Sequence, residues 1–474
     1  MKTRISILKL VFLLLSGNLI AGEMISYNEY TNTIKTQLTS VKVNQITLEK
    51  VSNTIIQTRG AGDTSLSAGA EMNNGKTEAD SSSYITDSAA GTLFSLGAAK
   101  KILDTGTTIS AGVSYQHNLI KAHSLNNKQT AFNYAASVPA VKLTISQSLL
   151  KNALGINDRA AVTDAKLAYL IQEIQNDLDN QNNLIPFSVL YYQLAGQIKT
   201  IEYLKTSLSK ITVSEKQTKE QLEHGLIDND DYQSTKNLYF QYQNSVFTFE
   251  HAYNSLRTKL QYYFQAAEIN PDMNEWKLFL NRILTNNFEY ISFENTKTAK
   301  ILDLTEKRLK AAVKAAANSA LPDLSLYGSL LLSGSSDSFI SSFTNITSSP
   351  QYAAGIALNF PLENRTAKSL LKNKELELKS YNLQFAQTKQ NYEIQLKNLI
   401  REISVKRSIL QNTIERLQAL KSMYKTQSER HEQGRINQIT LNDTLIKIAA
   451  EEINLIDCEY SLIALSFDYE KITF

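Results

Sequence analysis

Apolar residues recur at every seventh position through long stretches of the chain. One such row is Leu371, Leu378, Phe385, Tyr392 and Leu399, and a second row is Leu396, Ile403, Leu410, Leu417 and Tyr424. Sustained heptads of this kind are typical of coiled coils. A helix over 365–433 would be about 100 Å long at about 1.5 Å per residue, so it must pack against other rods rather than around a small core.

Short segments with strictly alternating apolar and polar residues lie between the helical stretches. The apolar positions are Leu66, Ala68, Ala70 and Met72; Ile109, Ala111, Val113 and Tyr115; Val141, Leu143 and Ile145; Leu324, Leu326, Leu330 and Leu332; and Ala354, Ile356, Leu358 and Phe360. Alternation with period two predicts strands that are apolar on one face. Segments of about ten residues with one apolar face are typical of a membrane barrel wall, and they suit a soluble sandwich equally well.

The same order of elements occurs twice along the chain. A strand runs into Asn157–Arg159 in the first half and into Glu363–Arg365 in the second half. Each is followed by a long helical stretch that ends at a glycine, Gly225 or Gly434, and then by a shorter returning helix. Glycine adopts the left-handed conformation that ends a helix without the steric cost of a Cβ, so we expect each long helix to end and the chain to reverse there. The chain therefore reads as a tandem duplication.

Composition and charge narrow the possibilities further. The 474 residues are 42% hydrophobic and 20% charged, with few helix breakers: 17 Gly and 6 Pro. Residues 1–22 have a basic start, an apolar run and small residues, which is typical of a secretory signal peptide. The formal net charge of +3 equals the three cations of that segment, Lys2, Arg4 and Lys9, so charge does not favour a nucleic-acid partner. The single cysteine, Cys458, cannot form an internal disulfide.

With these pieces in order, the chain resembles the TolC family of outer-membrane efflux channels. The matching segments are Gln147–Leu150 with Gly155, Phe360–Leu362 with Arg365, His224–Ile227 and Gln433–Ile436. Ser148 departs from the family, which often has proline there. The segment Leu93–His117, with a turn at Asp104–Gly106, leaves open whether a protomer gives four or six strands to the barrel.

The resemblance implies a mainly α fold with β structure, made of long antiparallel coiled-coil hairpins and outer-membrane β-barrel strands. It divides the chain into a signal peptide (1–22), a first repeat (23–264, tip near 225), a connecting segment (265–300) and a second repeat (301–474, strand pair 323–360, tip near 434). It also implies a homotrimer in outer-membrane lipid with a long periplasmic extension. The partners would be a periplasmic adaptor and an inner-membrane pump of the RND or ABC type.

In that family the tunnel narrows where acidic residues of the second returning helix form a ring. The matching position here is Asp443, with Asn442 beside it and Thr440 where another acid is often found. A ring of three carboxylates would attract cations and repel anions. The alternative is that Asp443 is a solvated charge on a helix face.

Two further sets of residues follow from the resemblance. Asp231 and Arg435 match positions that link neighbouring hairpins in closed relatives. The two tips, Gly225–Leu226–Ile227 and Gly434–Arg435–Ile436, would dock the adaptor. For Asp231 and Arg435, the alternative is an exposed pair that contributes little to stability. For the two tips, the alternative is that they are plain turns without a partner.

The sequence contains no motif that predicts an enzyme, a metal site or a cofactor. The five histidines form no zinc-type pair with a nearby acid, and no glycine-rich phosphate loop follows a strand. A secreted filament protein with coiled-coil ends remains the alternative, but it predicts heptads only near the two ends and no tandem repeat. The cargo stays open among drugs, metal ions and polypeptides.

Overall fold

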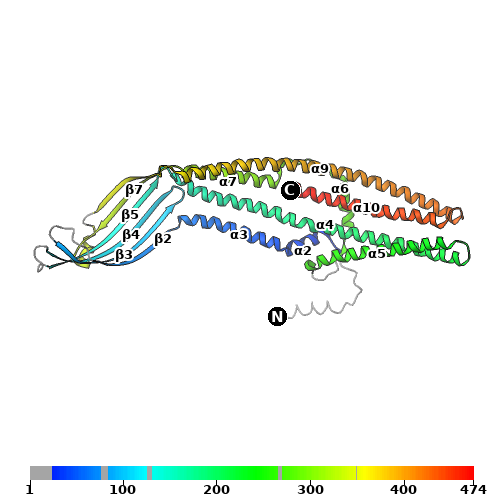
Figure 1. The fold of residues 1–474 in the computed structure, drawn as a ribbon, viewed down its shortest axis with the longest axis horizontal. Coiled ribbons are helices and arrows are strands. Elements are labelled where there is room, and N and C mark those ends of the chain that lie inside the picture. The colour runs from blue at the N-terminus through cyan, green and yellow to red at the C-terminus, as the bar shows by residue number, and fades with distance from the viewer. Residues whose placement is uncertain (1–23, 76–83, 125–130, 265–269, 348–349) are drawn as a thin grey trace, which may run out of the picture. The chain divides into compact units, whose positions relative to one another are not determined.

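The computed structural model describes residues 24–75, 84–124, 131–264, 270–347 and 350–474 (Figure 1). The expected signal peptide, 1–22, lies outside the described residues. The helices are α2 (Tyr27–Gln37), α3 (Thr39–Arg59), η1 (Gly60–Gly62), η2 (Ala153–Gly155), α4 (Ile156–Glu223), α5 (Asn229–Phe264), α6 (Met273–Thr285), η3 (Phe293–Asn295), α7 (Lys297–Ser319), α8 (Phe339–Thr344), α9 (Arg365–Glu432) and α10 (Gln438–Thr473). The strands are β1 (Met24–Ile25), β2 (Ser65–Gly75), β3 (Tyr84–Ile102), β4 (Thr107–Ser124), β5 (Ala131–Ser148), β6 (Asn270–Pro271), β7 (Asp323–Ser333) and β8 (Gln351–Asn359).

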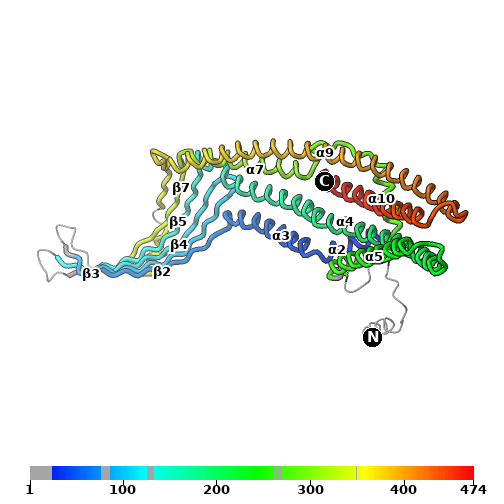
Figure 2. Tube along the Cα trace, turned by 45° about the vertical axis from the view of Figure 1, so that its right-hand side comes forward, coloured from blue at the N-terminus to red at the C-terminus, as the bar shows by residue number. Residues whose placement is uncertain are grey.

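The two long helical hairpins have the same dimensions. Helices α4 and α9 have 68 residues each, and the returning helices α5 and α10 have 36 each. In both hairpins the two helices run side by side in opposite directions (Figures 1 and 2). The buried residues of α9 are Tyr392, Leu396, Leu399, Ile403, Leu410, Thr413 and Leu417. Most of these belong to the two predicted heptad rows, so the fold class expected from the pattern is confirmed.

The compact units of the structure do not coincide with the sequence repeats. One unit contains residues 24–45, Gln175–Ala299 and Thr388–Phe474, and the other contains Ile46–Ile174 and Lys300–Gln387. Each unit therefore takes segments from both halves of the chain. Internally repeated hairpins of this kind are not expected of a filament protein with coiled coils only at its ends.

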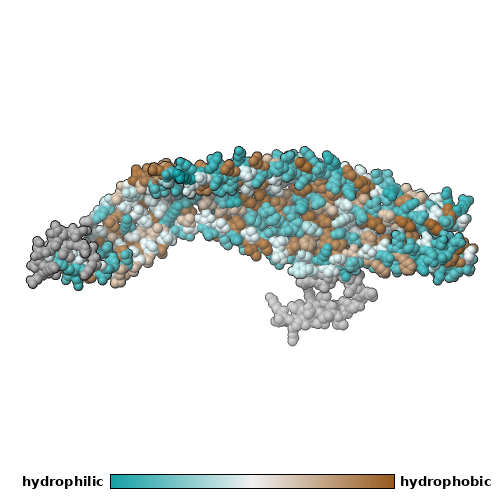
Figure 3. Space-filling model, viewed as in Figure 1, coloured by the Kyte–Doolittle hydropathy of each residue, from teal (hydrophilic) through white to brown (hydrophobic). Residues whose placement is uncertain are grey.

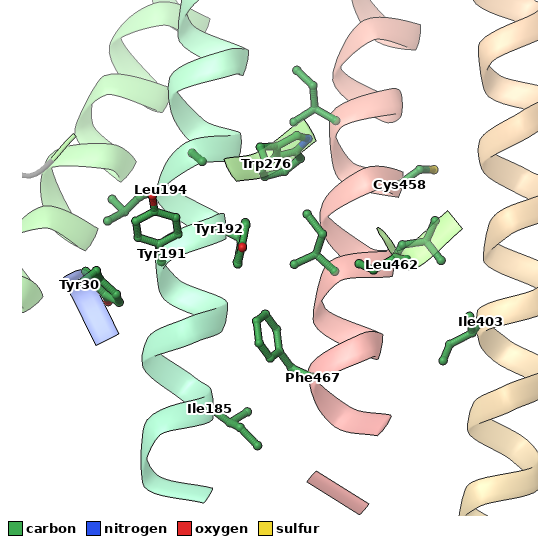
Figure 4. Close-up of a cluster of buried hydrophobic side chains, with 14 of the residues drawn as sticks. Tyr30, Ile185, Tyr191, Tyr192, Leu194, Trp276, Ile403, Cys458, Leu462 and Phe467 are labelled. Atoms are coloured by element: carbon green, nitrogen blue, oxygen red, sulfur yellow. The ribbon is translucent and has the colours of Figure 1, made fainter. Parts of the chain in front are cut away.

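An aromatic core holds the first unit together (Figure 4). Tyr192 of α4 stacks on Phe279 of α6 with ring centroids 4.8 Å apart, and Phe279 stacks on Phe467 of α10 at 5.2 Å. Tyr30 of α2 packs on the same cluster and donates a hydrogen bond to the Phe187 carbonyl at 3.0 Å. Burial of rings this large from four helices fixes α2, α4, α6 and α10 against one another.

A buried polar contact ties the connecting segment to both hairpins. Trp276 of α6 is 1% exposed, and its Nε1 donates to Glu459 Oε2 of α10 at 2.8 Å. Lys199 of α4 donates to the same oxygen at 2.5 Å and lies 4.7 Å from the Trp276 ring centroid. The sole tryptophan is therefore a packing residue that bridges α4, α6 and α10.

The second unit contains a six-stranded antiparallel sheet in the order β2-β3-β4-β5-β7-β8. Its first four strands come from one half of the chain and its last two from the other (Figure 1). The hairpin β3–β4 turns at Leu103–Gly106, where the sequence left an additional hairpin open, so the described residues form six strands in this sheet. Helix α8 lies in the Ser-rich segment between β7 and β8, with Phe339 and Phe343 packed on Tyr115 of β4.

Candidate functional site: the sheet faces and the hairpin tips

The pairing register gives the sheet two unlike faces. Large apolar side chains that are exposed on one face are Leu66, Met72, Phe94, Leu96, Ile109, Val113, Val141, Leu143, Ile145, Leu326, Ile356 and Leu358. The other face carries mainly small and polar residues, among them Ser67, Gly69, Ser95, Gly97, Ser110, Gly112, Lys142, Thr144, Ser329 and Gly355. The alternation predicted from the sequence is confirmed.

A face with this many exposed large apolar side chains favours an apolar environment. Exposed apolar patches larger than a few hundred Å² are rare on monomeric soluble proteins. The strands are also long, with 18 or 19 residues in β3, β4 and β5. Among the described residues, none of the helices combines the length and apolar character that crossing a membrane requires.

The hairpin tips of α4–α5 and α9–α10 have the same backbone geometry. Gly225 and Gly434 both adopt φ = 68°, a conformation that disfavours side chains with a Cβ. At the first tip the Leu226 N–H donates to the Gln221 carbonyl at 2.8 Å. At the second tip the Arg435 backbone N–H donates to the Arg430 carbonyl at 2.8 Å. Both pairs are the long hydrogen bond of a Schellman motif, which satisfies the last carbonyls of the long helix.

The two tips lie at the same end of their unit and together line a groove of about 240 Å³. The lining residues include Leu226, Ile227 and Asp231 from the first tip and Gly434 and Ile436 from the second. Leu226 is 72% exposed, although hydrophilic residues predominate around the tips on the face shown in Figure 3. The two turns, which share one backbone geometry, thus form a single small surface that contains both apolar and polar residues.

The three residues expected at a constriction do not share one environment. Asp443 and Thr440 are exposed on the first turns of α10. Asn437 caps the helix start, because its Oδ1 accepts from the N–H and from the hydroxyl of Thr440 at 3.1 and 2.7 Å. Asn442 is 6% exposed and lies inside the protomer. Of the three, only the side chains of Asp443 and Thr440 are exposed.

Asn442 is the centre of a buried hydrogen-bond network that the sequence did not predict. Its Oδ1 accepts from Gln438 Nε2 at 3.0 Å and from Ser214 Oγ of α4 at 3.4 Å. Its Nδ2 donates to Thr235 Oγ1 of α5 at 3.2 Å. The network therefore joins the start of α10 to both helices of the other hairpin. Ser214 and Thr235 occupy heptad-like buried positions, and that is the only sequence signal that could have found them.

Asp231 and Arg435 are not joined to each other within the described part of this chain. Asp231 is partly buried in the first turn of α5 and lines the tip groove, whereas Arg435 is exposed. No ion pair connects the two side chains in the part of the chain that the structure describes. Nearby, Tyr232 donates to Glu215 Oε1 at 3.0 Å, and this hydrogen bond raises the pKa of Tyr232.

The described residues contain no cluster of three or more His, Cys, Asp or Glu side chains that could hold a metal ion. The histidines at the tips, His224 and His431, both line a larger groove of about 800 Å³ between the two hairpins.

Comparisons with known proteins agree with this architecture. The family model described as "Outer membrane efflux protein" matches residues 303–465. A comparison with curated protein sequences gives no match. Among solved structures, the chain is similar to VceC of Vibrio cholerae, with a TM-score of 0.63 and 10% identity over 94% of this chain and 96% of that one.

Two further solved structures have the same fold. The open-state MtrE channel of Neisseria gonorrhoeae gives a TM-score of 0.64 and 12% identity over 94% of this chain and 88% of that one. The CmeC channel of Campylobacter jejuni gives a TM-score of 0.60 and 12% identity over 97% of this chain and 90% of that one. At such low identity, these similarities establish the fold along nearly the whole chain.

Proposed function

By its sequence over residues 303–465 and by its fold, this chain belongs to the outer membrane efflux protein family, and from that premise we propose how it works as an efflux channel. It is a channel of the outer membrane with helices that extend into the periplasm, and it is not an enzyme. We propose that it provides a passive conduit for cargo that an energised inner-membrane pump delivers.

The sheet with its two unlike faces carries this proposal. A face of exposed Leu, Ile, Val and Phe side chains suits hydrocarbon, and a face of Ser, Gly, Thr and Lys suits a water-filled lumen. Both outer strands of the sheet, β2 and β8, have one edge without a partner among the described residues. Open strand edges are not tolerated in lipid, because their N–H and C=O groups would lose water without gaining a partner.

Three copies resolve the edge problem. If β2 of one copy pairs with β8 of the next, three sheets close into one barrel of about 18 strands. With strands about 4.8 Å apart and tilted by about 40°, that barrel measures about 35 Å between opposite backbones. This wall is wide, so we place the narrowest point of the conduit at the hairpin tips.

At the tips, Asp443 from three copies would form the acidic ring, with the Thr440 hydroxyl beside it. Both side chains are exposed at the start of α10, which supports this arrangement. Asn442 completes the predicted constriction set, and we propose that it acts indirectly by holding α10 in position through its contacts with α4 and α5.

We propose that Asp231 and Arg435 link neighbouring copies when the conduit is closed. Each lacks an ion-pair partner among the described residues of its own copy, which leaves both available to another copy. Exposed pairs contribute only about 0–1 kcal/mol each, so three links bias the gate without locking it.

The tip groove is the proposed docking surface for a periplasmic adaptor. Gly225, Leu226 and Ile227 with Gly434, Arg435 and Ile436 form two equivalent turns at the same end of the unit. Small and apolar residues allow a helical hairpin of a partner to approach closely. The pump behind the adaptor is of the RND or ABC type.

Conductance in a planar lipid bilayer tests the function. The purified protein should insert and conduct, and it should fractionate with outer membranes. A water-soluble preparation that gives no current would refute the proposal. Crosslinking from Leu226→Cys to a co-expressed adaptor, with Ser234→Cys farther along α5 as the matched control, tests the docking surface.

A further inference from the structure

A groove of about 650 Å³ lies within the unit that contains the sheet. Its walls are the end of α3 with η1, the turn between β3 and β4, and the first turns of α4. Its lining residues are Arg59, Gly62, Asp63, Lys100, Lys101, Ile102, Leu103, Asp104, Arg159, Val162, Thr163 and Lys166. Five of these twelve are cationic and two are acidic.

Most of these cations have no carboxylate partner. Lys101 is paired with Asp158 at 2.8 Å. The remaining four, Arg59, Lys100, Arg159 and Lys166, form no ion pair within the described ranges. They outnumber the two lining carboxylates, Asp63 and Asp104, so the groove has a net positive charge and suits an anion.

The backbone around the groove is tightly packed. A Cβ on Gly155 would lie 1.9 Å from the Leu103 carbonyl oxygen, so the β3–β4 turn rests directly on the segment before α4. Gly106 in that turn has φ = 71°, and a Cβ there would lie 2.7 Å from the Asn152 carbonyl oxygen. Asn152 in turn donates to Asp158 Oδ2 at 2.7 Å. The cations are therefore carried on walls that are fixed before any ligand binds.

The groove continues the apolar face of the sheet. Along β3 the exposed Phe94 and Leu96 are followed on the same face by Ala98 and then by Lys100, which pairs in register with Ile109. Alternate residues on a strand are about 6.7 Å apart. An acyl chain lying on Phe94 and Leu96 would thus end in a headgroup beside Lys100, at the end of the sheet where α3 and α4 join it.

We propose that this groove binds the phosphate of an anionic phospholipid, whose acyl chain covers the neighbouring apolar face. The inference rests on the proposed function, because it requires that face to lie in lipid. Arg159 and Arg59 recognise phosphate through their planar guanidinium groups, and Lys100 and Lys166 add point charges. The bound lipid contacts the preformed β3–β4 turn, α3 and α4 at the inner surface of the membrane.

Native mass spectrometry of the detergent-solubilised, full-length assembly tests the proposal. Short-chain phosphatidylglycerol should bind more tightly than phosphatidylcholine of the same chain length. Each cation near an anionic lipid contributes about fivefold in affinity, so the double variant Arg159→Gln/Lys166→Gln should bind phosphatidylglycerol about 25-fold more weakly. The matched control, Lys314→Gln/Lys368→Gln, removes two exposed charges of the same unit outside the groove and should bind as the parent does.

Three outcomes would overturn the lipid assignment. These are equal binding of the two lipids, an equal loss in the control variant, and binding of inorganic phosphate as tight as that of phosphatidylglycerol. The same samples are measured for conductance in a planar bilayer. If they conduct normally but show no lipid preference, only this inference fails, whereas a parent protein that never inserts contradicts the proposed function itself. Normal conductance of the Arg159→Gln/Lys166→Gln variant also establishes that it folds.

Discussion

Asn442→Ala should open the channel by releasing α10 from the other hairpin. The side chain takes part in three hydrogen bonds, at 3.0, 3.2 and 3.4 Å, with residues of α10, α5 and α4. Each neutral hydrogen bond contributes about 0.5–1.5 kcal/mol, and the longest of the three is weak. We therefore expect the described conformation to lose about 2 kcal/mol per protomer.

That loss should be visible in single-channel records. A change of about 1.4 kcal/mol is tenfold in an equilibrium constant, so the ratio of open to closed conformation should rise about thirtyfold for each protomer. The ratio of open to closed time of the whole channel should rise by at least that factor, and by more when the three copies open together. The measurement is current through single channels in a planar bilayer at fixed voltage. Lys447→Ala, which removes an exposed side chain of the same helix, is the matched control and should leave the ratio unchanged. If Asn442→Ala also leaves it unchanged, the network does not hold the closed conformation.

Three other changes test separate parts of the account. Asp443→Asn should lower the permeability of cations relative to anions, measured as the reversal potential in a salt gradient, and an unchanged potential would place Asp443 away from the lumen. Gly155→Ala should destabilise the folded protein by about 3 kcal/mol or more in denaturant unfolding, because its Cβ would meet the Leu103 carbonyl oxygen at 1.9 Å and φ is 65°. Gly434 has a φ of 68°, but an added Cβ there would meet open space, so Gly434→Ala should lower the free energy of unfolding by only about 1–2 kcal/mol. Equal losses of stability in the two variants would show that the close contact at Gly155 does not matter. Excision of residues 84–124 removes β3 and β4 but leaves β2 and β5 to pair as a hairpin. Electron microscopy should then show a narrower barrel, and an unchanged diameter would mean that β3 and β4 are not part of the barrel wall.

Periodicity was sufficient to predict the long helices and the orientation of the strands. The heptad rows through Tyr392, Leu399 and Leu410 are buried, because a rod can exclude water only along the stripe that meets its neighbours. The alternation along Ile109–Val113 and Val141–Ile145 lies on the predicted faces, because a strand places successive side chains on opposite sides. Gly225 and Gly434 end the long helices, as their freedom at positive φ requires.

The details of the tips could not be read from local pattern. Asn442 was expected beside Asp443 at a constriction, but one residue along a helix turns a side chain by about 100°, and this rotation places Asn442 inside the protomer. Its partners Ser214 and Thr235 come from distant parts of the chain, so their heptad-like spacing predicts burial but does not predict a hydrogen bond to Asn442. The number of strands also depended on a long-range pairing, that of β3 with β2, which the turn at Asp104–Gly106 suggested without deciding.

Electron microscopy of the full-length protein in lipid nanodiscs tests the proposed assembly most directly. The account predicts three copies around one axis, a barrel of about 18 strands in the lipid, and one continuous conduit that narrows at the tips near Asp443. A single copy without a pore, or a sheet whose apolar face lies in water, would contradict it.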